Sequence, residues 1–307
     1  MKLIPSDFIW RNGELIPWAD ATIHALAHVV HYGSGVFEGV RAYPGDGGPN
    51  ILGLKEHVRR LFESCHIIGM PLDYEPSVIE DAIVQTVRAN KHESCYIRPF
   101  AFRGYGELGV DPTTSPVETM VATFPWGALM GSEALEQGVD VAVSSWRRMA
   151  PSTHPAMAKA AGNYLNSQLV VMEAKANGFA EGVVLDVDGY VAEGSGENIF
   201  VVRDGRILTP TTGGSILAGV TRRYVMDLAR EAGIEVVEQR IAREMLYTCD
   251  ELFFTGTAAE VTPVRSVDRR LVKDGKRGPI TALLQKNYFD RVYARVEDKG
   301  GWLTPVR

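Results

Sequence analysis

The sequence has few cysteines, no long apolar run and no block of basic residues. Its three cysteines, Cys65, Cys95 and Cys249, are far apart and form no CxxC pair, so we expect buried thiols rather than a zinc or redox site. No apolar stretch approaches the roughly 18 residues of a transmembrane helix. The first apolar run ends at Pro5, too early for a signal peptide. These absences predict a cytoplasmic protein without a membrane role.

Charge and composition exclude further classes of protein. The 32 Lys and Arg residues against 38 Asp and Glu residues give a net charge of −6, which argues against nucleic acid or an anionic membrane as the main partner. Hydrophobic residues make up 45% and charged residues 23% of the 307 residues, so a disordered chain is excluded. The 31 glycines are well above the usual share of roughly 7% and predict many tight turns or close backbone approaches.

Part of this glycine excess is explained by turns between short apolar runs. Asn12-Gly13 predicts a hairpin with a type I′ turn, and Asp188-Gly189, Asp204-Gly205 and Asp274-Gly275 are interpreted in the same way. Apolar periodicity predicts five helices, near residues 58–68, 78–87, 163–177, 221–232 and 280–295. The first, third and fourth of these end at Gly69, Gly178 and Gly233.

The elements group into two predicted domains. Residues 1–125 hold a hairpin, two helices and strands near residues 37–43, 95–103 and 118–124, and residues 138–307 hold further strands with interleaved helices. Residues 126–137 are interpreted as an interdomain loop, because Pro125 directly precedes them and Gly127 and Gly131 lie near their start. Ligand sites are common at such boundaries.

Two familiar site patterns are incomplete. His24, His28 and His31 have helical spacing, but Ala25 stands where a zincin has glutamate, and we expect no metal. The run Gly194-Ser195-Gly196 begins like a dinucleotide fingerprint, yet the third glycine is missing and a β-rich segment follows instead of a helix.

A different combination points to pyridoxal phosphate chemistry. Lys159 lies among small residues that leave room beside its amine, as a Schiff-base lysine needs, although a surface lysine is the alternative. Tyr164 follows five residues later, and Glu193 ends a strand where it could face a pyridinium nitrogen or simply solvent. Residues 219–222 and 254–259 offer turns that could bind anions, or act only as a helix cap and a loop.

Longer motifs resemble one known family. They are the segments 31–41 (HYGSGVFEGVR), 96–99 (YIRP), 124–127 (FPWG), 158–164 (AKAAGNY), 193–198 (EGSGEN) and 256–264 (GTAAEVTPV). Together, and in order along essentially the whole chain, they resemble the branched-chain amino-acid aminotransferases, which are class IV, fold-type IV pyridoxal-phosphate enzymes. The resemblance implies an α/β fold with α+β character. A protein of this family would have a small α/β domain, a larger domain with a barrel-like β core, and the site at the domain interface.

The resemblance also implies roles for individual residues. Lys159 would carry pyridoxal 5′-phosphate, with Tyr164 on the ring hydroxyl and Glu193 on the ring nitrogen. The phosphate would lie among Arg60, Leu217, Gly219, Val220, Thr221, Gly256 and Thr257. Substrate would be held by Phe37, Tyr96, Arg98, Trp126, Thr257 and Ala258, and by Tyr32, Leu108 and Val110 from a neighbouring subunit. Leu129 stands where some bacterial members have tyrosine, which leaves the pocket shape open, and His154 precedes the lysine in an unusual stretch.

The reaction implied is reversible, ping-pong transamination of L-leucine, L-isoleucine and L-valine with 2-oxoglutarate. The partners would be these amino acids and 2-oxo acids, and the assembly a homodimer or a higher homo-oligomer of dimers. Alternatives on the same fold are D-amino-acid or (R)-amine transamination and aminodeoxychorismate lyase activity. A cofactor carrier without turnover is an alternative of a different class.

Overall fold

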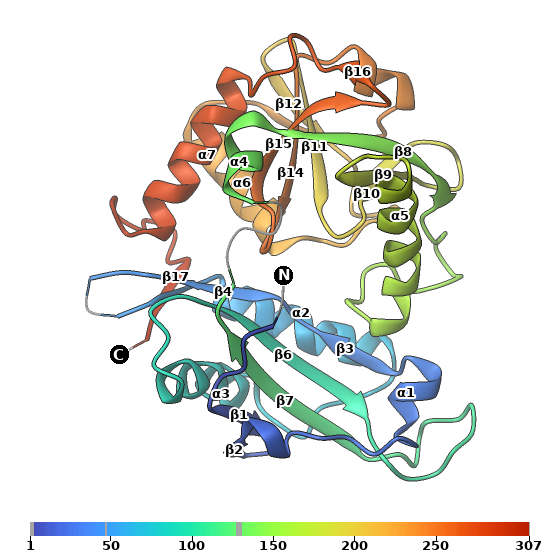
Figure 1. Cartoon of the computed structure of the whole chain (residues 1–307), viewed down its shortest axis with the longest axis vertical. Helices are drawn as coiled ribbons and strands as arrows, with labels where there is room; N and C mark the ends of the chain where they lie inside the picture. Colours follow the sequence, from blue (N-terminus) through green and yellow to red (C-terminus); the bar gives the residue numbers. More distant parts are fainter. Residues whose placement is uncertain (1–2, 47, 127–130, 307) are drawn as a thin grey trace. The chain divides into compact units, whose positions relative to one another are not determined.

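The computed structural model describes residues 3–46, 48–126 and 131–306. Two compact units make up the chain (Figure 1). Unit 1 comprises Met1–Trp126, Ala158–Gly162 and Arg291–Arg307, and unit 2 comprises Gly127–Met157 and Asn163–Asp290. The short Lys159 segment therefore belongs to unit 1, although the residues before and after it belong to unit 2.

Unit 1 is built on an antiparallel sheet of eight strands within the described residues. Their spatial order is β17 (Leu303–Pro305), β5 (Asn50–Leu52), β4 (Val40–Tyr43), β6 (Cys95–Arg103), β7 (Val117–Phe124), β1 (Phe8–Arg11) and β2 (Glu14–Pro17), with β3 (Gly35–Phe37) also paired to β6. The predicted first hairpin is confirmed, because Arg11 pairs with Glu14 and both Asn12 and Gly13 have the positive φ of a type I′ turn.

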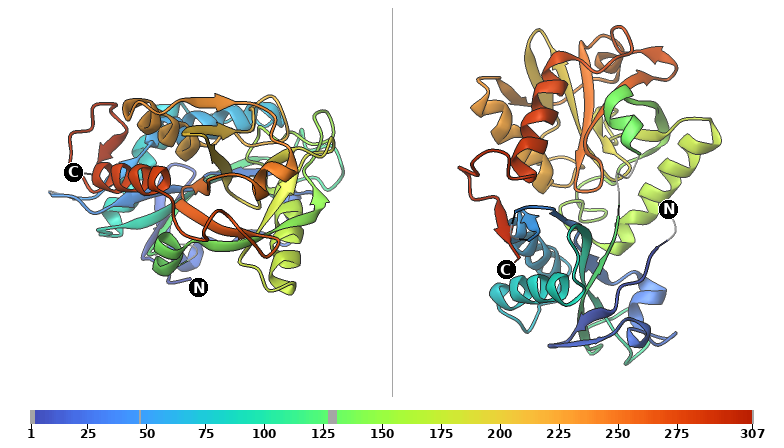
Figure 2. Two further views of the ribbon diagram at one scale, coloured as in Figure 1. Left: turned by 90° about the horizontal axis from the view of Figure 1, so that it is seen from above. Right: turned by 60° about the vertical axis from the view of Figure 1, so that its left-hand side comes forward.

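Two helices, α2 (Leu54–Ile67) and α3 (Pro76–Ala89), pack on each other and on strands of this sheet (Figures 1 and 2). They match the first two predicted helices, and their apolar positions are buried in one core with Val36 and Ile97 of the sheet. Unit 1 also contains η1 (Trp18–Asp20) and the short α1 (His28–Tyr32). A hydrophobic core of unit 1 therefore lies between the two helices and the face of the sheet that they cover.

The strand predicted near residues 37–43 is divided in two. β3 ends at Phe37 and β4 begins at Val40, so that Glu38 and Gly39 lie between them. Alternation along a strand would put Glu38 on the same face as the buried Val36. Glu38 is indeed fully buried, since α2 supplies polar partners for its carboxylate.

Unit 2 contains a mixed sheet of nine strands within the described residues. Their order is β10 (Val191–Gly194), β9 (Glu181–Leu185), β8 (Val139–Arg147), β15 (Glu260–Val267), β14 (Glu251–Gly256), β11 (Asn198–Arg203), β12 (Arg206–Thr209) and β13 (Val236–Glu238), with β16 (Arg270–Leu271) paired to β15. β8 runs parallel to β9 and β15, and β12 runs parallel to β13. The sheet curls around an apolar core to which most of these strands contribute.

The helices of unit 2 are α4 (Ser132–Gln137), α5 (Tyr164–Ala176), α6 (Val220–Glu231) and most of α7 (Pro279–Val292), with η3 (Arg243–Tyr247). Along the chain, η2 (Ala161–Asn163) leads from the Lys159 segment into α5. Three predicted helices are thereby confirmed, although α7 ends three residues earlier than expected. α4 occupies part of the segment interpreted as a loop. Among the described residues, no helix has the length and apolarity to cross a membrane.

The remaining turn predictions had mixed outcomes. Asp204-Gly205 joins β11 to β12 as predicted, whereas Asp188-Gly189 lies in a longer connection between Leu185, where β9 ends, and Val191, where β10 begins. The interpretation of Asp274-Gly275 as a hairpin turn was wrong, because β16 pairs with the preceding β15 and with no later strand among the described residues. The chain instead turns between β15 and β16 at Asp268-Arg269, where both residues have positive φ. The Asp268 carboxylate is anchored by Val143 N–H and Arg243, which no local sequence pattern indicates.

Candidate functional site

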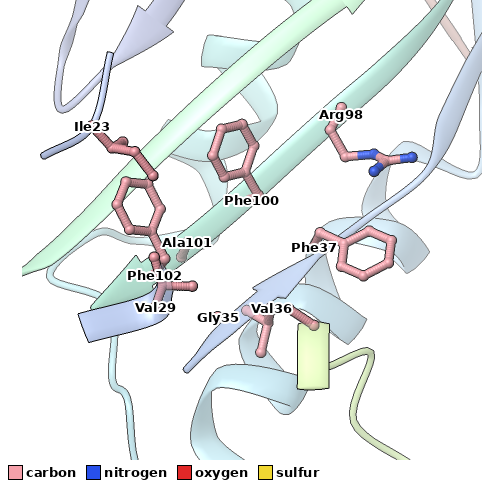
Figure 3. Close-up of a pocket in the computed structure, with 10 residues that line it drawn as sticks. Ile23, Val29, Gly35, Val36, Phe37, Arg98, Phe100, Ala101 and Phe102 are labelled. Carbon is pink, nitrogen blue, oxygen red and sulfur yellow. The ribbon is translucent and has the colours of Figure 1, made fainter. Parts of the chain in front are cut away.

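Three groups converge on Phe37 in unit 1. The Lys159 Nζ lies 5.1 Å from the centroid of the Phe37 ring, and the Arg98 Cζ lies 4.7 Å from it. Phe37 and Arg98 also line an apolar hollow of about 320 Å³, together with Ile23, Val29, Gly35, Val36, Phe100, Ala101, Phe102 and Ala161 (Figure 3). An amine, a guanidinium and an apolar surface therefore meet at one aromatic side chain.

The backbone of Lys159 is fixed on both sides. Its N–H donates to Ser64 Oγ on α2 at 3.0 Å, and its carbonyl accepts the N–H of Phe37 at 3.1 Å. The neighbouring Ala160 forms an antiparallel bridge with Val36 and is buried in the core. The small residues around the lysine thus have a packing role, because they bring this short segment against the sheet.

Aromatic side chains border the same region. The rings of Tyr96 and Trp126 are 4.6 Å apart, and the Arg98 guanidinium lies 5.3 Å from the Tyr96 ring. Arg98 Nη2 donates to Tyr96 Oη at 3.4 Å, whereas its buried Nε has no hydrogen-bond partner among the described residues. The rings therefore stabilise the cation by cation–π contact, and no described carboxylate forms an ion pair with it.

Arg60 and Arg59, neighbours on α2, differ sharply in environment. Arg60 is buried and makes a side-on ion pair with Glu38, with Nε donating to Oε1 at 2.7 Å and Nη2 to Oε2 at 2.9 Å. The Arg59 side chain is 62% exposed and forms an ion pair with the exposed Glu63. The helix thus directs one arginine inward, and it is the one that the motif comparison selected.

In unit 2 the carboxylate of Glu193 is buried and surrounded by donors. A bulge between Val191 and Glu193 shifts the register of β10 at this position. Arg148 Nε lies 2.8 Å from Glu193 Oε1, while Oε2 accepts the N–H of Leu217 at 3.1 Å and Asn198 Nδ2 at 3.4 Å. These contacts favour the ionised carboxylate in a site from which water is mostly excluded.

Two backbone turns lie near this carboxylate within unit 2. α6 begins just after Gly219, and its first turn contains the buried Val220 and Thr221. Asn198 Nδ2 also donates to the Leu217 carbonyl at 2.9 Å, which ties β11 to the segment before α6. Asn198 pairs across the sheet with Thr255, next to the loop of Gly256, Thr257 and Ala258. The first N–H groups of a helix and of such a loop are suited to anions.

The other predicted residues divide between the units. Tyr32, Leu108 and Val110 are all exposed in unit 1, where His28 Nε2 contacts the Gly109 carbonyl at 2.8 Å and so joins α1 to the 104–110 loop. Both ring nitrogens of His28 are thus hydrogen-bonded, Nδ1 with Ser34 and Nε2 with Gly109. The described residues contain no cluster suited to a metal. Tyr164 begins α5 in unit 2, His154 contacts Asn163 at 3.3 Å, and Leu129 lies outside the described residues.

The family described as "Amino-transferase class IV" matches residues 35–267. The branched-chain-amino-acid aminotransferase of Salmonella typhimurium is 47% identical over 302 residues, 98% of each chain. The solved structure of Escherichia coli branched-chain amino acid aminotransferase has a TM-score of 0.96 at 47% identity and covers 98% of this chain and 100% of that one. The chain belongs to the class IV aminotransferases, in the branched-chain aminotransferase family. The family and fold class predicted from the motifs are confirmed.

Structures of the T.th. branched-chain amino acid aminotransferase are similar too, at TM-scores of 0.95 or 0.94 and 45% or 44% identity, covering 99% of this chain and 100% of that one. They contain pyridoxamine 5′-phosphate, N-(5′-phosphopyridoxyl)-L-glutamate or 4-methylvaleric acid.

Sequence reasoning about this aminotransferase did not identify Glu38, His57 and Arg148 as contacts of the candidate site residues and of one another. Glu38 lies inside the family motif of residues 31–41, but its burial against α2 follows only from the break between β3 and β4. Arg148 is 45 residues from Glu193, and the two meet because β8, β9 and β10 are adjacent. Neither contact has a local signal in the sequence.

Proposed function

We propose that this chain transfers amino groups reversibly between L-leucine, L-isoleucine or L-valine and 2-oxoglutarate, as a cytoplasmic homodimer or an oligomer of dimers that uses pyridoxal 5′-phosphate. The observation that carries the proposal is the convergence on Phe37. There a lysine amine, an arginine without a carboxylate partner among the described residues, and an apolar hollow lie within one unit. Buried free cysteines are consistent with the reducing cytoplasm.

The residues present fit this cofactor. Its carbonyl needs a primary amine, which Lys159 offers, and its ring nitrogen needs a buried carboxylate such as Glu193. Its phosphate needs cationic and N–H donors, which Arg60, the first turn of α6 with Thr221, and the loop with Thr257 provide. When bound, pyridoxal phosphate supplies a carbonyl that condenses with the substrate amine and a ring that accepts the electron pair left at Cα.

The chain's own residues direct the proton transfers. Lys159 would act as the general base that removes the Cα proton of the substrate and as the acid that delivers it again. Glu193, held in its ionised form by Arg148 and by the Leu217 N–H, keeps a proton on the ring nitrogen. Tyr96 and the turn of Thr257 and Ala258 bind the substrate carboxylate. Tyr164 binds the ring hydroxyl.

Arg98 explains how one pocket takes both an aliphatic and an acidic side chain. Leaving a buried cation unpaired costs several kcal/mol. Contact of the Arg98 guanidinium with the Phe37 and Tyr96 rings reduces this cost when leucine occupies the hollow. When glutamate binds, the edge of the guanidinium donates to the distal carboxylate. Complexes of the T.th. relative with a glutamate adduct and with 4-methylvaleric acid support this dual recognition.

Exposed apolar side chains support the assembly. In unit 1, α1 and the 104–110 loop are joined through His28 and present Tyr32, Leu108 and Val110 to solvent. Large apolar side chains grouped on one surface mark an interaction site. We propose that a second copy covers this surface, and that these three residues reach the neighbouring subunit's substrate.

A donor panel in half-reactions tests the proposed function. The purified chain with pyridoxal phosphate is mixed with L-leucine, D-alanine or (R)-1-phenylethylamine, and loss of the cofactor's visible band is followed. We expect fast loss with L-leucine and at least about a hundredfold slower loss with the other two, a difference of about 2.8 kcal/mol in barrier. Lys159→Ala should lose the borohydride-reducible band. A faster response to D-alanine or to the amine would overturn the proposed donor.

A further inference from the structure

Glu38 is an unusual residue in the core of unit 1. Its side chain has no exposed surface, and it lies among strands whose other inward residues, such as Val36 and Val40, are apolar. Its two carboxylate oxygens accept from His57 Nδ1 at 2.7 Å and from Arg60 Nε and Nη2 at 2.7 and 2.9 Å, and Oε2 also accepts the Gly39 N–H at 3.3 Å. Three donors from one helix face thus satisfy the hydrogen-bonding capacity of a buried carboxylate, as is usual for buried polar groups.

The charge states of this cluster follow from its contacts. Burial raises the pKa of Glu38, but the charge of Arg60 and the hydrogen bonds of Arg60 and His57 outweigh burial and hold that pKa well below its usual range. Burial lowers the pKa of His57, and its attraction to Glu38 only partly opposes this. At neutral pH the carboxylate is therefore ionised and the imidazole neutral, with Nδ1–H donating and the Arg60 charge compensated.

The geometry of the ion pair restricts what Arg60 can do. Side-on pairing uses Nε and Nη2, and these two bonds to one carboxylate fix the plane of the guanidinium. His57, Arg60 and Ser64 lie at i, i+3 and i+7 on α2, so they share one face of the helix. Ser64 accepts the N–H of Lys159, so this face also holds the lysine backbone.

We propose that Glu38 is a positioning residue for the phosphate of the cofactor. It acts through Arg60, whose guanidinium it holds in one orientation, while His57 Nδ1 and the Gly39 N–H supply the other hydrogen bonds of the carboxylate. The proposal rests on the proposed function, because it takes Arg60 as the phosphate ligand. It predicts that Glu38 determines the affinity for the phosphate group and not for the pyridine ring.

The test compares pyridoxal 5′-phosphate with pyridoxal, which lacks the phosphate. Dissociation constants of both are measured by absorbance titration of the apoprotein, for the wild type and for Glu38→Gln, which keeps the shape of the side chain and removes its charge. We expect the phosphorylated ligand to bind about tenfold to a hundredfold more weakly, the loss that is typical at metal sites when the outer partner of a ligating side chain is removed. Pyridoxal affinity should change less than about threefold, within the spread of a neutral substitution.

Three further variants complete the test. Arg60→Gln should show the same selective loss, and the double variant should be no weaker than Arg60→Gln alone. Glu63→Gln, an exposed carboxylate on the same helix, should match the wild type. If Glu38→Gln does not fold, Glu38→Asp replaces it, because the shorter acid keeps the charge but cannot reach both Nε and Nη2.

The outcomes separate this proposal from the proposed function. Equal weakening of both ligands, no weakening, or additive losses in the double variant would overturn the positioning role of Glu38 even if the wild type transaminates L-leucine normally. A wild-type chain that binds neither ligand and does not respond to L-leucine would instead overturn the proposed function.

Discussion

At the scale of single residues, Arg98 is the side chain on which we expect substrate choice to depend. Arg98→Met keeps an apolar stem beside Phe37 and removes the guanidinium that contacts two rings. Losing hydrogen bonds between charged groups costs about 1.5–3 kcal/mol, so we expect the half-reaction with glutamate to lose about tenfold to a hundredfold in kcat/KM. The half-reaction with L-leucine should lose less than about threefold, within the usual range of neutral substitutions. Stopped-flow spectra give both values, and equal losses would contradict dual recognition.

The residues also show where sequence reasoning stops. The motif comparison selected Arg60 over Arg59, and the structure gives the physical difference, since one is buried with Glu38 and the other is largely exposed. The contacts of Glu193 with Arg148 and of Lys159 with Ser64 join segments 45 and 95 residues apart. Such pairs depend on strand order and helix placement, which hydrophobic periodicity does not encode.

At the scale of elements, the start of α6 depends on one glycine. A Cβ at Gly219 would overlap the Asn198 side-chain oxygen and would lie 3.1 Å from Arg222 Cβ. In Gly219→Ala the Asn198 amide must therefore turn away from the Leu217 carbonyl and from Glu193. We expect a loss of about 1–3 kcal/mol in the free energy of unfolding, the usual cost of an unsatisfied buried polar group, together with weaker cofactor binding.

The matched control for this substitution is Gly213→Ala. A Cβ there meets no heavy atom within 4 Å, so the free energy of unfolding should stay within about 0.5 kcal/mol of the wild type. Denaturant unfolding of both variants, with cofactor titration, makes the comparison. If Gly219→Ala is as stable as Gly213→Ala and binds the cofactor equally well, the close approach has no role in holding this site.

Elements were predictable where the signal is local. Apolar spacing in α2 and α3, and glycine after α2, α5 and α6, are short-range patterns, and these helices are present. The split between β3 and β4 was not predictable, because it follows from a carboxylate that needs partners on α2. The β15–β16 turn was missed for a similar reason, since Asp268 is anchored by Val143, Arg243 and Tyr247 from elsewhere in unit 2.

At the scale of the whole molecule, the three thiols report unfolding. Burial raises the pKa of Cys65 and of Cys95 to about 12 and that of Cys249 to about 11. A pKa raised above the pH leaves little thiolate, about one part in ten thousand at pH 8 for a pKa of 12, so the native protein should not react with a disulfide reagent. All three should react after unfolding in denaturant. Rapid labelling of any of them in the native protein would show that its surroundings open without global unfolding.

The positions of these thiols extend the experiment to the two units. Cys65 and Cys95 belong to unit 1 and Cys249 to unit 2. Mass spectrometry of labelled peptides along a denaturant series would give an unfolding curve for each unit. Coincident curves would indicate one cooperative transition, and separate curves would indicate that one unit stays folded without the other.

Assembly is tested by a charge placed on the proposed subunit surface. Val110 is 84% exposed in the single chain, so Val110→Asp should not destabilise the monomer, whereas burying the new carboxylate against a second copy carries a desolvation cost of several kcal/mol. Light scattering should then give the 33.7 kDa of one chain instead of a multiple of it, with loss of transamination. Val187→Asp, on an exposed valine of unit 2, is the matched control and should keep both the assembly and the activity. An assembled and fully active Val110→Asp protein would show that this loop is not part of the active interface.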